Sequence, residues 1–589
     1  MSRNDSWRGL SRSRGRGARV LIMLGMVGLA LVMISTPWPV VTQAQDGVEP
    51  TTVIPPEYAA QIPSTIRRNL LDLAGASAVV SARALLATQM GGKEITVADE
   101  SQATSPKKLL DVPVGEHPTK HENEPTVAVN PVDKKKLVAG SHFSGLPPPT
   151  TNFCVAYTSS DRGESWSGPV QMPHLTPLSA CSDPVLAYAP DGSRVYYSYM
   201  DIKQIFVDPP GPPPPTLTID FDIVISYSDD DGDTWTGPIV ALNGAPTIVT
   251  FNPPPAPPNV VAGFEYDKNW HGTHIDASES NRVYLTATRF DESPPFACHI
   301  AFTRSSDQGQ TWSAPILLDS SGGGCGVGAN PLVQGSRPTG GVGGEVLVAW
   351  FNSGADGWLT GGFQIRTRRS GNFGGAFDPA VVAASDSFEL PFWLGPFVFY
   401  HRWWGGMFPD VEIDPGGNAH IVYTHDPAAN PIPGFSDTAE DGDVRYVTSQ
   451  GAPYGAGSWS APETVNDDGL VRAQGYAAME TDGGGSSHVH VIWEDHRLSL
   501  DVPAVFPNSS NLFYDIFYSR KTPGNSGWRP NSRVTEASSI NDFIFIGDYN
   551  DLAISNKVFA IFTDRRHRTS IFELEDNVFG SLITPHPKD

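Results

Sequence analysis

The chain has 589 residues, a formal net charge of −24 at pH 7, 58 glycines, 53 prolines and 10% aromatic residues. This length allows a large core, and the abundance of glycine and proline favours an all-β fold over a helical one. The negative charge excludes nucleic acid and an anionic membrane surface as the main partner, because a protein binds phosphates through a basic face.

Residues 1–44 have the pattern of a secretory signal. Arginines between Arg3 and Arg19 precede the apolar run 20–34, and the small residues Thr42 and Ala44 suit a cleavage site. An N-terminal membrane anchor is the alternative, although the apolar run is shorter than the roughly 20 residues of a full span. The pattern predicts a secreted protein, extracellular or periplasmic, with no membrane span once the signal is removed.

Residues 45–120 lack the alternation of strands and are expected to form a linker or pro-region. The stretch 64–90 is amphipathic and begins at Ser64, a residue type that caps helices, so one helix is predicted there. The proline-rich stretches 208–215 and 252–258 are expected to be surface loops, since proline cannot pair within a central strand.

Residues 121–589 repeat a unit of four short strands. Each unit starts with a strand that begins at a polar residue, as in NEPTVAV and SDPVLAY, and its second strand ends in polar residues, as in VYYSYMD and VIWEDHR. Seven first strands and seven second strands follow this pattern. The repeat predicts a β-propeller, seven-bladed with six blades as the alternative. The last unit shows three strands, so a strand near 95–115 is expected to close the ring.

A polar motif of the form S-x-D-x-G-x-x-W recurs at 159–166, 228–235 and 305–312. Serine and aspartate suit hydrogen bonds within a turn, glycine allows a positive φ, and tryptophan fills the space between blades. The frame resembles the Asp-box, or BNR, repeat of the sialidase (neuraminidase) superfamily, where it lies on the third-to-fourth strand turn, away from the substrate. The resemblance implies a structural role for Asp161, Trp166, Asp230, Trp235, Asp307 and Trp312.

The four cysteines are evenly arranged around two copies of the motif. The same spacing separates Cys154 from Cys181 and Cys298 from Cys325. Because exported thiols are usually oxidised, these two pairs are predicted to be disulfides. A zinc site is the weaker interpretation, since no C-x-x-C or neighbouring histidine pair accompanies them.

Functional residues are expected on the rim where first strands begin and second strands end. The sialidase resemblance implies an exo-glycosidase of exo-alpha-sialidase type that acts on a carbohydrate or glycoconjugate. Its chemistry needs an arginine clamp for the substrate carboxylate, an acid, and a tyrosine nucleophile paired with a glutamate. The segment DYNDL (548–552) resembles the family's region around that tyrosine. The candidates are Tyr549 as nucleophile, Glu494 as its partner, Asp183 or Asp267 as the acid, Arg289, Arg497 and Arg565 as the clamp, and Trp270 and His271 as further substrate-binding residues.

One departure from the family keeps a second function open. True sialidases begin their first blade with Arg-Ile-Pro, whereas the matching position here reads Asn123-Glu124-Pro125. A noncatalytic propeller that binds glycan or protein is therefore the alternative, and hydrolysis of another glycan by a different carboxylate pair also remains open.

No cofactor and no catalytic metal are predicted. His271 and His274 would lie on opposite faces of a strand, which disfavours a shared metal ion. A structural calcium ion bound by rim carboxylates is the remaining possibility for a metal.

Overall fold

The computed structural model describes residues 54–55, 58, 61–62, 111–116, 120–145, 152–253, 256–327, 329–354, 361–386, 405–427, 442–470, 472–483, 487–499, 513–522, 527–540, 546–567 and 576–584. The predicted signal and the helix predicted over 64–90 lie outside these residues. None of the helices in the described part of the chain has the length and apolar character needed to cross a bilayer.

The chain divides into two compact units. The first comprises residues 1–89, 205–217 and 249–260, and within it the ring of Tyr58 packs against Phe206 and Phe251, with centroid distances of 5.3 and 5.1 Å. The second unit contains the remaining residues and holds most of the repeated sheets.

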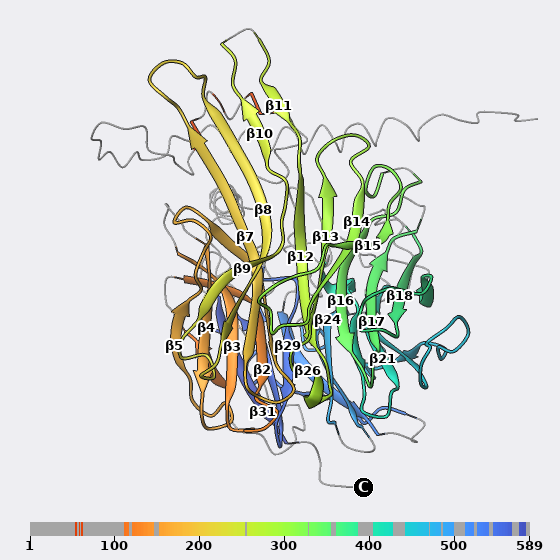
Figure 1. Cartoon of the computed structure of the whole chain (residues 1–589). Coiled ribbons are helices and arrows are strands. Elements are labelled where there is room, and N and C mark those ends of the chain that lie inside the picture. The colour runs from red at the N-terminus through yellow and green to blue at the C-terminus, as the bar shows by residue number, and fades with distance from the viewer. Residues whose placement is uncertain are drawn as a thin grey trace, which may run out of the picture. The chain divides into compact units, whose positions relative to one another are not determined.

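Seven antiparallel sheets make up the repeat (Figure 1), and in each of them the first three strands of the blade pair in chain order. Blade 1 consists of β2 (Lys120–Val129), β3 (Leu137–Gly145), β4 (Asn152–Ser159) and β5 (Ser167–Gln171). Blade 2 consists of β6 (Ala180–Tyr188), β7 (Val195–Val207), β8 (Thr216–Ser228) and β9 (Thr236–Leu242), with β10 (Thr247–Thr250) and β11 (Asn259–Val261) added. Blade 3 consists of β12 (Phe264–Thr273), β13 (Val283–Asp291), β14 (Cys298–Ser305) and β15 (Ile316–Ser320).

The later blades follow the same plan. Blade 4 consists of β16 (Val333–Gly340), β17 (Val346–Asn352), β18 (Phe363–Ser370) and β19 (Val381–Asp386), and blade 5 of β20 (Asp410–Ile413), β21 (Ala419–His425), β22 (Asp443–Ser449) and β23 (Glu463–Thr464). Blade 6 consists of β24 (Gln474–Thr481), β25 (Val489–Asp495), β26 (Phe513–Lys521), β27 (Ser532–Arg533) and β28 (Ser539–Ile540). Blade 7 consists of β29 (Asp551–Ile554), β30 (Val558–Asp564), β31 (Asn577–Ile583) and β1 (Val112–Gly115). Two short 3₁₀ helices, η1 (Ala277–Glu279) and η2 (Gly405–Met407), complete the described elements.

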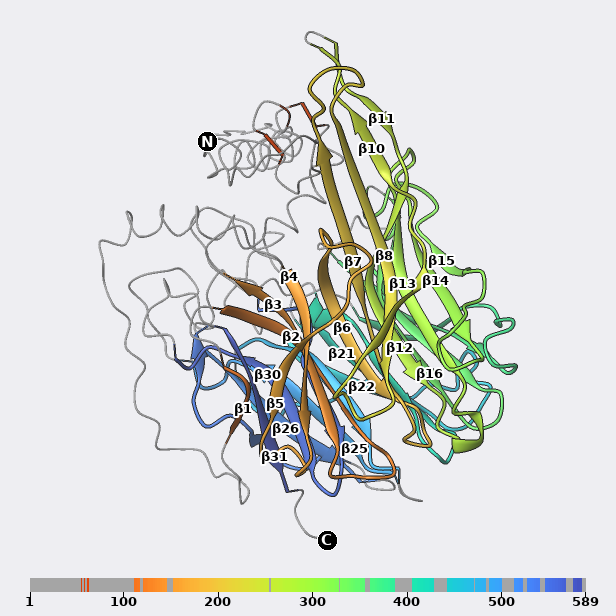
Figure 2. The ribbon, with the colours of Figure 1, turned by 60° about the vertical axis from the view of Figure 1, so that its left-hand side comes forward.

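The first strands form a closed ring. Each of β2, β6, β12, β16, β20, β24 and β29 contacts the first strand of the next blade, and β29 contacts β2. Blade 7 takes its fourth strand from the other end of the sequence, because β1 pairs with β31 in an antiparallel register that places Val112 opposite Gly580 (Figure 2). The predicted seven-bladed propeller and its closing strand are confirmed. Since β1 lies within residues 45–120, the propeller includes the end of the segment expected to be a linker.

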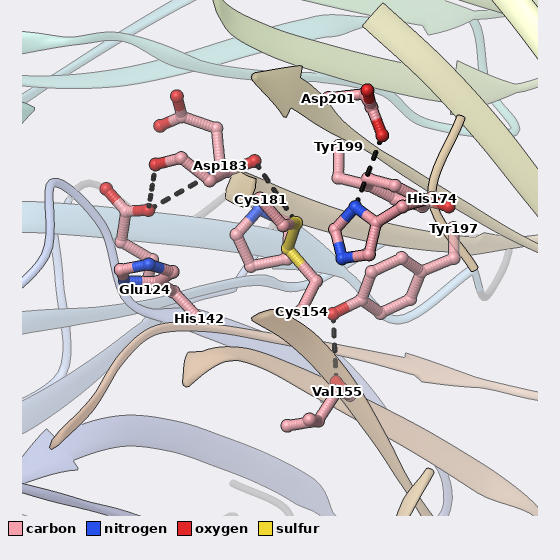
Figure 3. Close-up of a disulfide and its surroundings, with 12 residues drawn as sticks. Glu124, His142, Cys154, Val155, His174, Cys181, Asp183, Tyr197, Tyr199 and Asp201 are labelled. Carbon is pink, nitrogen blue, oxygen red and sulfur yellow. Dashed lines mark hydrogen bonds and ion pairs between the residues drawn. A yellow bond between two sulfur atoms is a disulfide. The ribbon is translucent and has the colours of Figure 1, made fainter. Parts of the chain in front are cut away.

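Both predicted disulfides are present. Cys154 on β4 bonds to Cys181 on β6, which joins blade 1 to blade 2 (Figure 3). Cys298 on β14 bonds to Cys325, which precedes the first strand of blade 4. Each bridge therefore ties the third strand of one blade to the chain that begins the next.

The three copies of the polar motif form the same turn between third and fourth strands. In the first copy Ser159 donates to Asp161 Oδ1 at 2.8 Å, and the backbone N–H groups of Gly163 and Ser165 donate to Ser159 Oγ and Asp161 Oδ1. The copies at 228–235 and 305–312 repeat these bonds. The motif glycines have φ values of 80° to 93°, which explains why glycine stands there.

The motif tryptophans pack at or near the boundary between blades. Trp166 lies 5.4 Å from Phe559 of blade 7, measured between ring centroids, and Trp235 lies 5.6 Å from Tyr197. Trp312 packs against a cluster that includes Tyr196 of blade 2 and Val283 of blade 3. In an antiparallel blade these turns share one rim, the turn rim, with the hairpins between first and second strands. The opposite rim, the start rim, is where first strands begin and second strands end.

Candidate functional site

Near the start rim, four charged side chains from four neighbouring blades meet. Lys268 of blade 3 places its Nζ 2.7 Å from Asp183 Oδ1 of blade 2 and 2.6 Å from Asp548 Oδ2, just before blade 7. Glu124 Oε1 of blade 1 lies 3.6 Å from the same ammonium. Oxygen atoms of the three acids all lie within 4.8 Å of one another. We call these four residues the Lys268 cluster.

A repeated bulge aims three members of the cluster toward one another. The register of β2, β6, β12, β16 and β24 with their second strands is interrupted, and in each strand two residues stand opposite one. The first residue of each bulge has a positive φ, which is 53° at Glu124, 52° at Asp183 and 51° at Lys268. The same position is held by Gly335 in blade 4 and Tyr476 in blade 6. A bulge bends the strand and turns one side chain in a new direction. The bulge recurs in five blades and therefore belongs to the fold, whereas charged residues stand at its first position in blades 1 to 3.

Burial and neighbouring charges shift the pKa values of two members of the cluster, Glu124 and Lys268. Glu124 is 0% exposed, and Asp183 and Asp548 are each 1% exposed. Burial and the neighbouring Asp183 raise the pKa of Glu124 to about 8, although Lys268 opposes this shift. Burial would lower the pKa of Lys268, but the three acids together raise it well above its usual value. These surroundings favour the protonated form of Glu124 and the charged form of Lys268.

Glu124 also connects two blades. Its Oε2 accepts the backbone N–H of Asp183 at 3.1 Å, as Figure 3 shows beside the disulfide. Its Oε1 has no hydrogen-bond partner among the described residues. A buried polar atom without a partner is uncommon in folded proteins and marks a place where a proton or a ligand atom can be accommodated.

Tyr549 lies next to the cluster but is not prepared to ionise. Its hydroxyl donates to the carbonyl of Pro184 at 2.7 Å, and its ring packs edge-on against Trp270 at 5.2 Å. Burial, followed by the charges of Glu124 and Asp183, raises the pKa of Tyr549 well above its usual value. A tyrosine that acts as a nucleophile needs a lowered pKa instead.

The three arginines predicted as a clamp are engaged in three different ion pairs. Arg289 pairs with Asp291 at 2.8 Å in blade 3, and Arg497 pairs with Asp495 at 2.8 Å in blade 6. Arg565, after β30 of blade 7, is completely buried against Asp576 at 2.8 Å. Their guanidinium groups are thus neutralised by acids of their own blades.

Glu494, the predicted partner of Tyr549, has a different environment. It is 0% exposed, and its Oε1 lies 3.7 Å from His496 Nε2. Burial raises the pKa of Glu494 to about 8, while His496 and Arg565 oppose the shift. The described contacts of Glu494 and Tyr549 thus involve different residues.

The other residues predicted for the site, Asp267, His271 and Trp270, make contacts of their own. Asp267 accepts the backbone N–H of Lys268 and the side-chain amide of Gln334, both at 2.8 Å, so it points toward blade 4. His271 is buried with its Nδ1 2.7 Å from Ser198 Oγ, whereas His274 Nε2 lies 2.8 Å from the carbonyl of Gly343. Trp270 has Arg337 above its ring at 3.5 Å. Of the predicted residues, the structure brings together Asp183, Trp270 and Tyr549.

A second set of acids links first strands through the backbone. Asp410 at the start of β20 accepts the N–H of Met479 in blade 6 at 2.8 Å and pairs with Arg337 at 2.8 Å. Asp551 at the start of β29 accepts the N–H of Val127 in blade 1 at 2.9 Å. We call Asp410 and Asp551 the bridging aspartates. They fasten blade 5 to blade 6 and blade 7 to blade 1.

Sequence reasoning missed Lys268 and assigned no catalytic role to Glu124 or Asp548. The signal was present, because Glu124, Asp183 and Lys268 occupy the same position of the repeat. The cluster's oxygen atoms are close enough to hold a cation, but Lys268 Nζ already lies among them. These residues therefore do not suit the calcium ion that remained a possibility.

The chain matches no protein-family model and has no significant match among curated proteins. Among solved structures it is similar to a protein of unknown function from Dyadobacter fermentans, with 14% identity, 72% of this chain and 97% of that chain covered, and a TM-score of 0.37. It is also similar to the GH93 α-L-arabinofuranosidase of Fusarium graminearum, with 11% identity, 81% and 98% covered, and a TM-score of 0.38. A third is Trypanosoma rangeli sialidase, with 11% identity, 82% and 60% covered, and a TM-score of 0.35. These values describe a likeness of fold and carry nothing about activity.

Proposed function

We propose that the chain is a secreted glycoside hydrolase that uses the carboxylates of the Lys268 cluster, with Glu124 as the general acid. The supporting observation is the group of three buried carboxyl oxygens within 4.8 Å of one another around a single ammonium. Carboxyl groups whose surroundings give them different protonation states are the recurring requirement of glycoside hydrolysis. The two disulfides suit an extracellular protein.

Each member of the cluster has a distinct role in this proposal. Glu124 stays protonated up to about pH 8 and donates its proton to the leaving glycosidic oxygen. Asp183 or Asp548, facing the Lys268 ammonium, acts as the second carboxylate on the sugar. A separation below 4.8 Å is closer to the roughly 5 Å of retaining enzymes than to the wider gap that inverting enzymes need for a water molecule. We therefore expect retention of the anomeric configuration.

The carboxylate reaction fits the contacts better than a sialidase-type reaction does. A sialidase-type reaction would require Tyr549 to ionise beside Glu494 and the arginines to converge on a substrate carboxylate. Instead Tyr549 donates to Pro184, its pKa is raised, and Arg289, Arg497 and Arg565 are bound by separate acids. The sugar we expect is accordingly neutral and lacks a carboxylate.

A noncatalytic propeller that binds glycans is the second candidate. The observation in its favour is the low exposure of the three carboxylates, none of which exceeds 1%. On this view the Lys268 cluster is an ion-pair network that fastens blades 1, 2, 3 and 7, and a ligand would bind the polar rim around it.

The two candidates are separated by turnover measurements on the secreted chain. A panel of neutral aryl and natural glycosides is assayed with the wild type, Glu124→Gln and Glu122→Gln. Glu122 is the matched control because it lies on the same strand, is 0% exposed and has a pKa raised to about 8 by burial, yet it bonds to Tyr157 and Ser141 instead of the cluster.

If Glu124 is the acid, Glu124→Gln lowers kcat on natural glycosides by about 10²- to 10⁴-fold. The loss should be smaller on aryl glycosides whose leaving group needs no proton, and Glu122→Gln should retain turnover. The wild-type rate should fall as pH rises through about 8, because the acid form is lost there. Turnover by the wild type that Glu124→Gln leaves unchanged would disprove the role of Glu124. No turnover on any glycoside, together with binding on a glycan array, would establish the second candidate.

A further inference from the structure

A cluster of two histidines and one aspartate lies at the turn rim of blade 6. Asp482 follows β24, His488 precedes β25, and His490 is the second residue of β25. One ligand atom from each residue lies within 4.8 Å of the other two. His488 Nδ1 is 2.5 Å from Asp482 Oδ2, and His490 Nε2 is 4.0 Å from the same oxygen.

The backbone brings the two histidines to one side. Residues two apart in an extended segment point to the same face of the sheet. Their ring centroids are 6.2 Å apart. The side chains of Asp482 and His488 are each 27% exposed, so solvent ions can reach the cluster from outside.

His490 is the buried member and has an unsatisfied atom. It is 2% exposed, and its Nδ1 lies 2.8 Å from the hydroxyl of Tyr518. Its Nε2, which faces Asp482, has no hydrogen-bond partner among the described residues. A histidine held at one nitrogen by an oxygen atom, with the other nitrogen open, has the arrangement typical of a metal ligand.

Blade 5 carries the same frame without the second histidine. Its residues are Asp414, Asn418, His420 and Tyr446, and His420 Nδ1 lies 2.7 Å from Tyr446 Oη. His420 Nε2 is 3.3 Å from Asp414 Oδ2, and the Asn418 amide donates to that oxygen at 2.9 Å. Blade 5 therefore forms a closed hydrogen-bond cluster. In blade 6 His488 stands two residues before His490, as Asn418 stands two before His420, and His490 Nε2 is too distant from Asp482 to bond.

We propose that Asp482, His488 and His490 bind a divalent transition-metal ion of the zinc class. Two imidazole nitrogens and one carboxylate oxygen suit Zn²⁺, Co²⁺ or Ni²⁺, whereas Ca²⁺ prefers an all-oxygen shell. Ligand distances of about 2.0–2.2 Å place neighbouring ligand atoms roughly 3.3 Å apart in a tetrahedron. Reaching that geometry requires Asp482 and His488 to separate slightly and His490 to approach.

The test is a metal titration of the full secreted chain, purified without a histidine tag and stripped with a chelator. Zn²⁺ binding is measured by calorimetry, and Co²⁺ binding by its visible absorption. We expect one equivalent bound, with an absorption spectrum typical of nitrogen and oxygen ligands, and a higher Tm in the presence of Zn²⁺. His488→Asn, which gives blade 6 the residue found in blade 5, should weaken binding at least tenfold.

Two further measurements make the result decisive. His488 is partly exposed, so His488→Asn should keep the Tm of the metal-free wild type. His420→Asn in blade 5 is the control and should bind Zn²⁺ as tightly as the wild type. Failure of the wild type to bind one equivalent, or equal losses in His488→Asn and His420→Asn, would overturn the proposal.

Discussion

The Lys268 cluster and the bridging aspartates both connect first strands of different blades, but they do so with different partners. Asp410 and Asp551 accept N–H groups of the neighbouring strand, which are fixed by the fold. Glu124, Asp183 and Asp548 instead share one flexible side chain, that of Lys268. Backbone donors cannot be rearranged without breaking the ring, whereas a lysine can exchange partners and protons. Similar residues at similar depth are thus held by backbone donors in one region and by a single side chain in the other.

The largest expected effect is that of Lys268→Met, which leaves the buried carboxyl groups of Glu124, Asp183 and Asp548 without a cation. Removing one partner of a buried ion pair costs about 3–5 kcal/mol of unfolding free energy. Urea unfolding at pH 8 would measure this loss. Lys134→Met is the control, because Lys134 is less enclosed and its Nζ lies 3.4 Å from the carbonyl of Ile554; it should cost less than about 1 kcal/mol. Equal losses of unfolding free energy in the two variants would show that Lys268 contributes no more to stability than Lys134 does.

Asp410→Ala tests the other side of the comparison. It leaves the N–H groups of Met479 and Val411 without their acceptor and Arg337 without its acid. We expect a loss of about 2–3 kcal/mol, with no change in kcat on any glycoside substrate. A large fall in kcat at retained stability would contradict the structural role of the bridging aspartates.

The pH dependence of stability should differ between wild type and Glu124→Gln. The pKa of Glu124 is raised from its ordinary value of 4.5 to about 8, so its contribution is fully present below pH 4.5 and is lost as pH rises through 8. Between pH 6 and 9 the wild type should lose roughly 2–3 kcal/mol more than Glu124→Gln, since pH 6 lies two units below the folded pKa and each unit is worth about 1.4 kcal/mol. Parallel curves from denaturant midpoints at several pH values would show that Glu124 is ionised in the folded protein.

Tyr549→Phe should have the smallest effect. It removes one hydrogen bond, to the carbonyl of Pro184, which is worth about 1 kcal/mol of unfolding free energy. If the cluster carboxylates carry the reaction, kcat should stay within a few-fold of wild type. Abolished turnover with unchanged Tm would instead establish Tyr549 as the nucleophile of a sialidase-type reaction.

The sequence predicted the fold closely because its signals are periodic. Seven first strands, three copies of the turn motif and two equal cysteine spacings each report the same repeat, and all seven sheets and both disulfides are present. The closing strand was expected near 95–115 because blade 7 lacked a fourth strand, and β1 occupies Val112–Gly115.

The site was harder to predict because bulges interrupt the alternation of side chains. The segment DKNWHGTHID places Asp267, Trp270 and His271 near the beginning of a first strand, but the bulge after Asp267 shifts the register and changes which side chains share a face. The shift brings Lys268 into the cluster and leaves His271 buried against Ser198. The arginines lie at or just after the ends of second strands, as expected, but a sequence does not reveal that acids such as Asp291 and Asp576 lie close enough to neutralise them.

The pairing of β1 with β31 has a topological consequence. Blade 7 combines strands from both ends of the propeller sequence. A backbone cut in a surface loop of another blade therefore leaves the ring of blades intact, because the two fragments still pair with each other within blade 7. Loss of β1 or β31, by contrast, removes the pairing that closes the ring at blade 7. Joining residue 583 to residue 112 through a short peptide and opening the chain at a different loop should therefore yield a permuted protein with the same ring of blades.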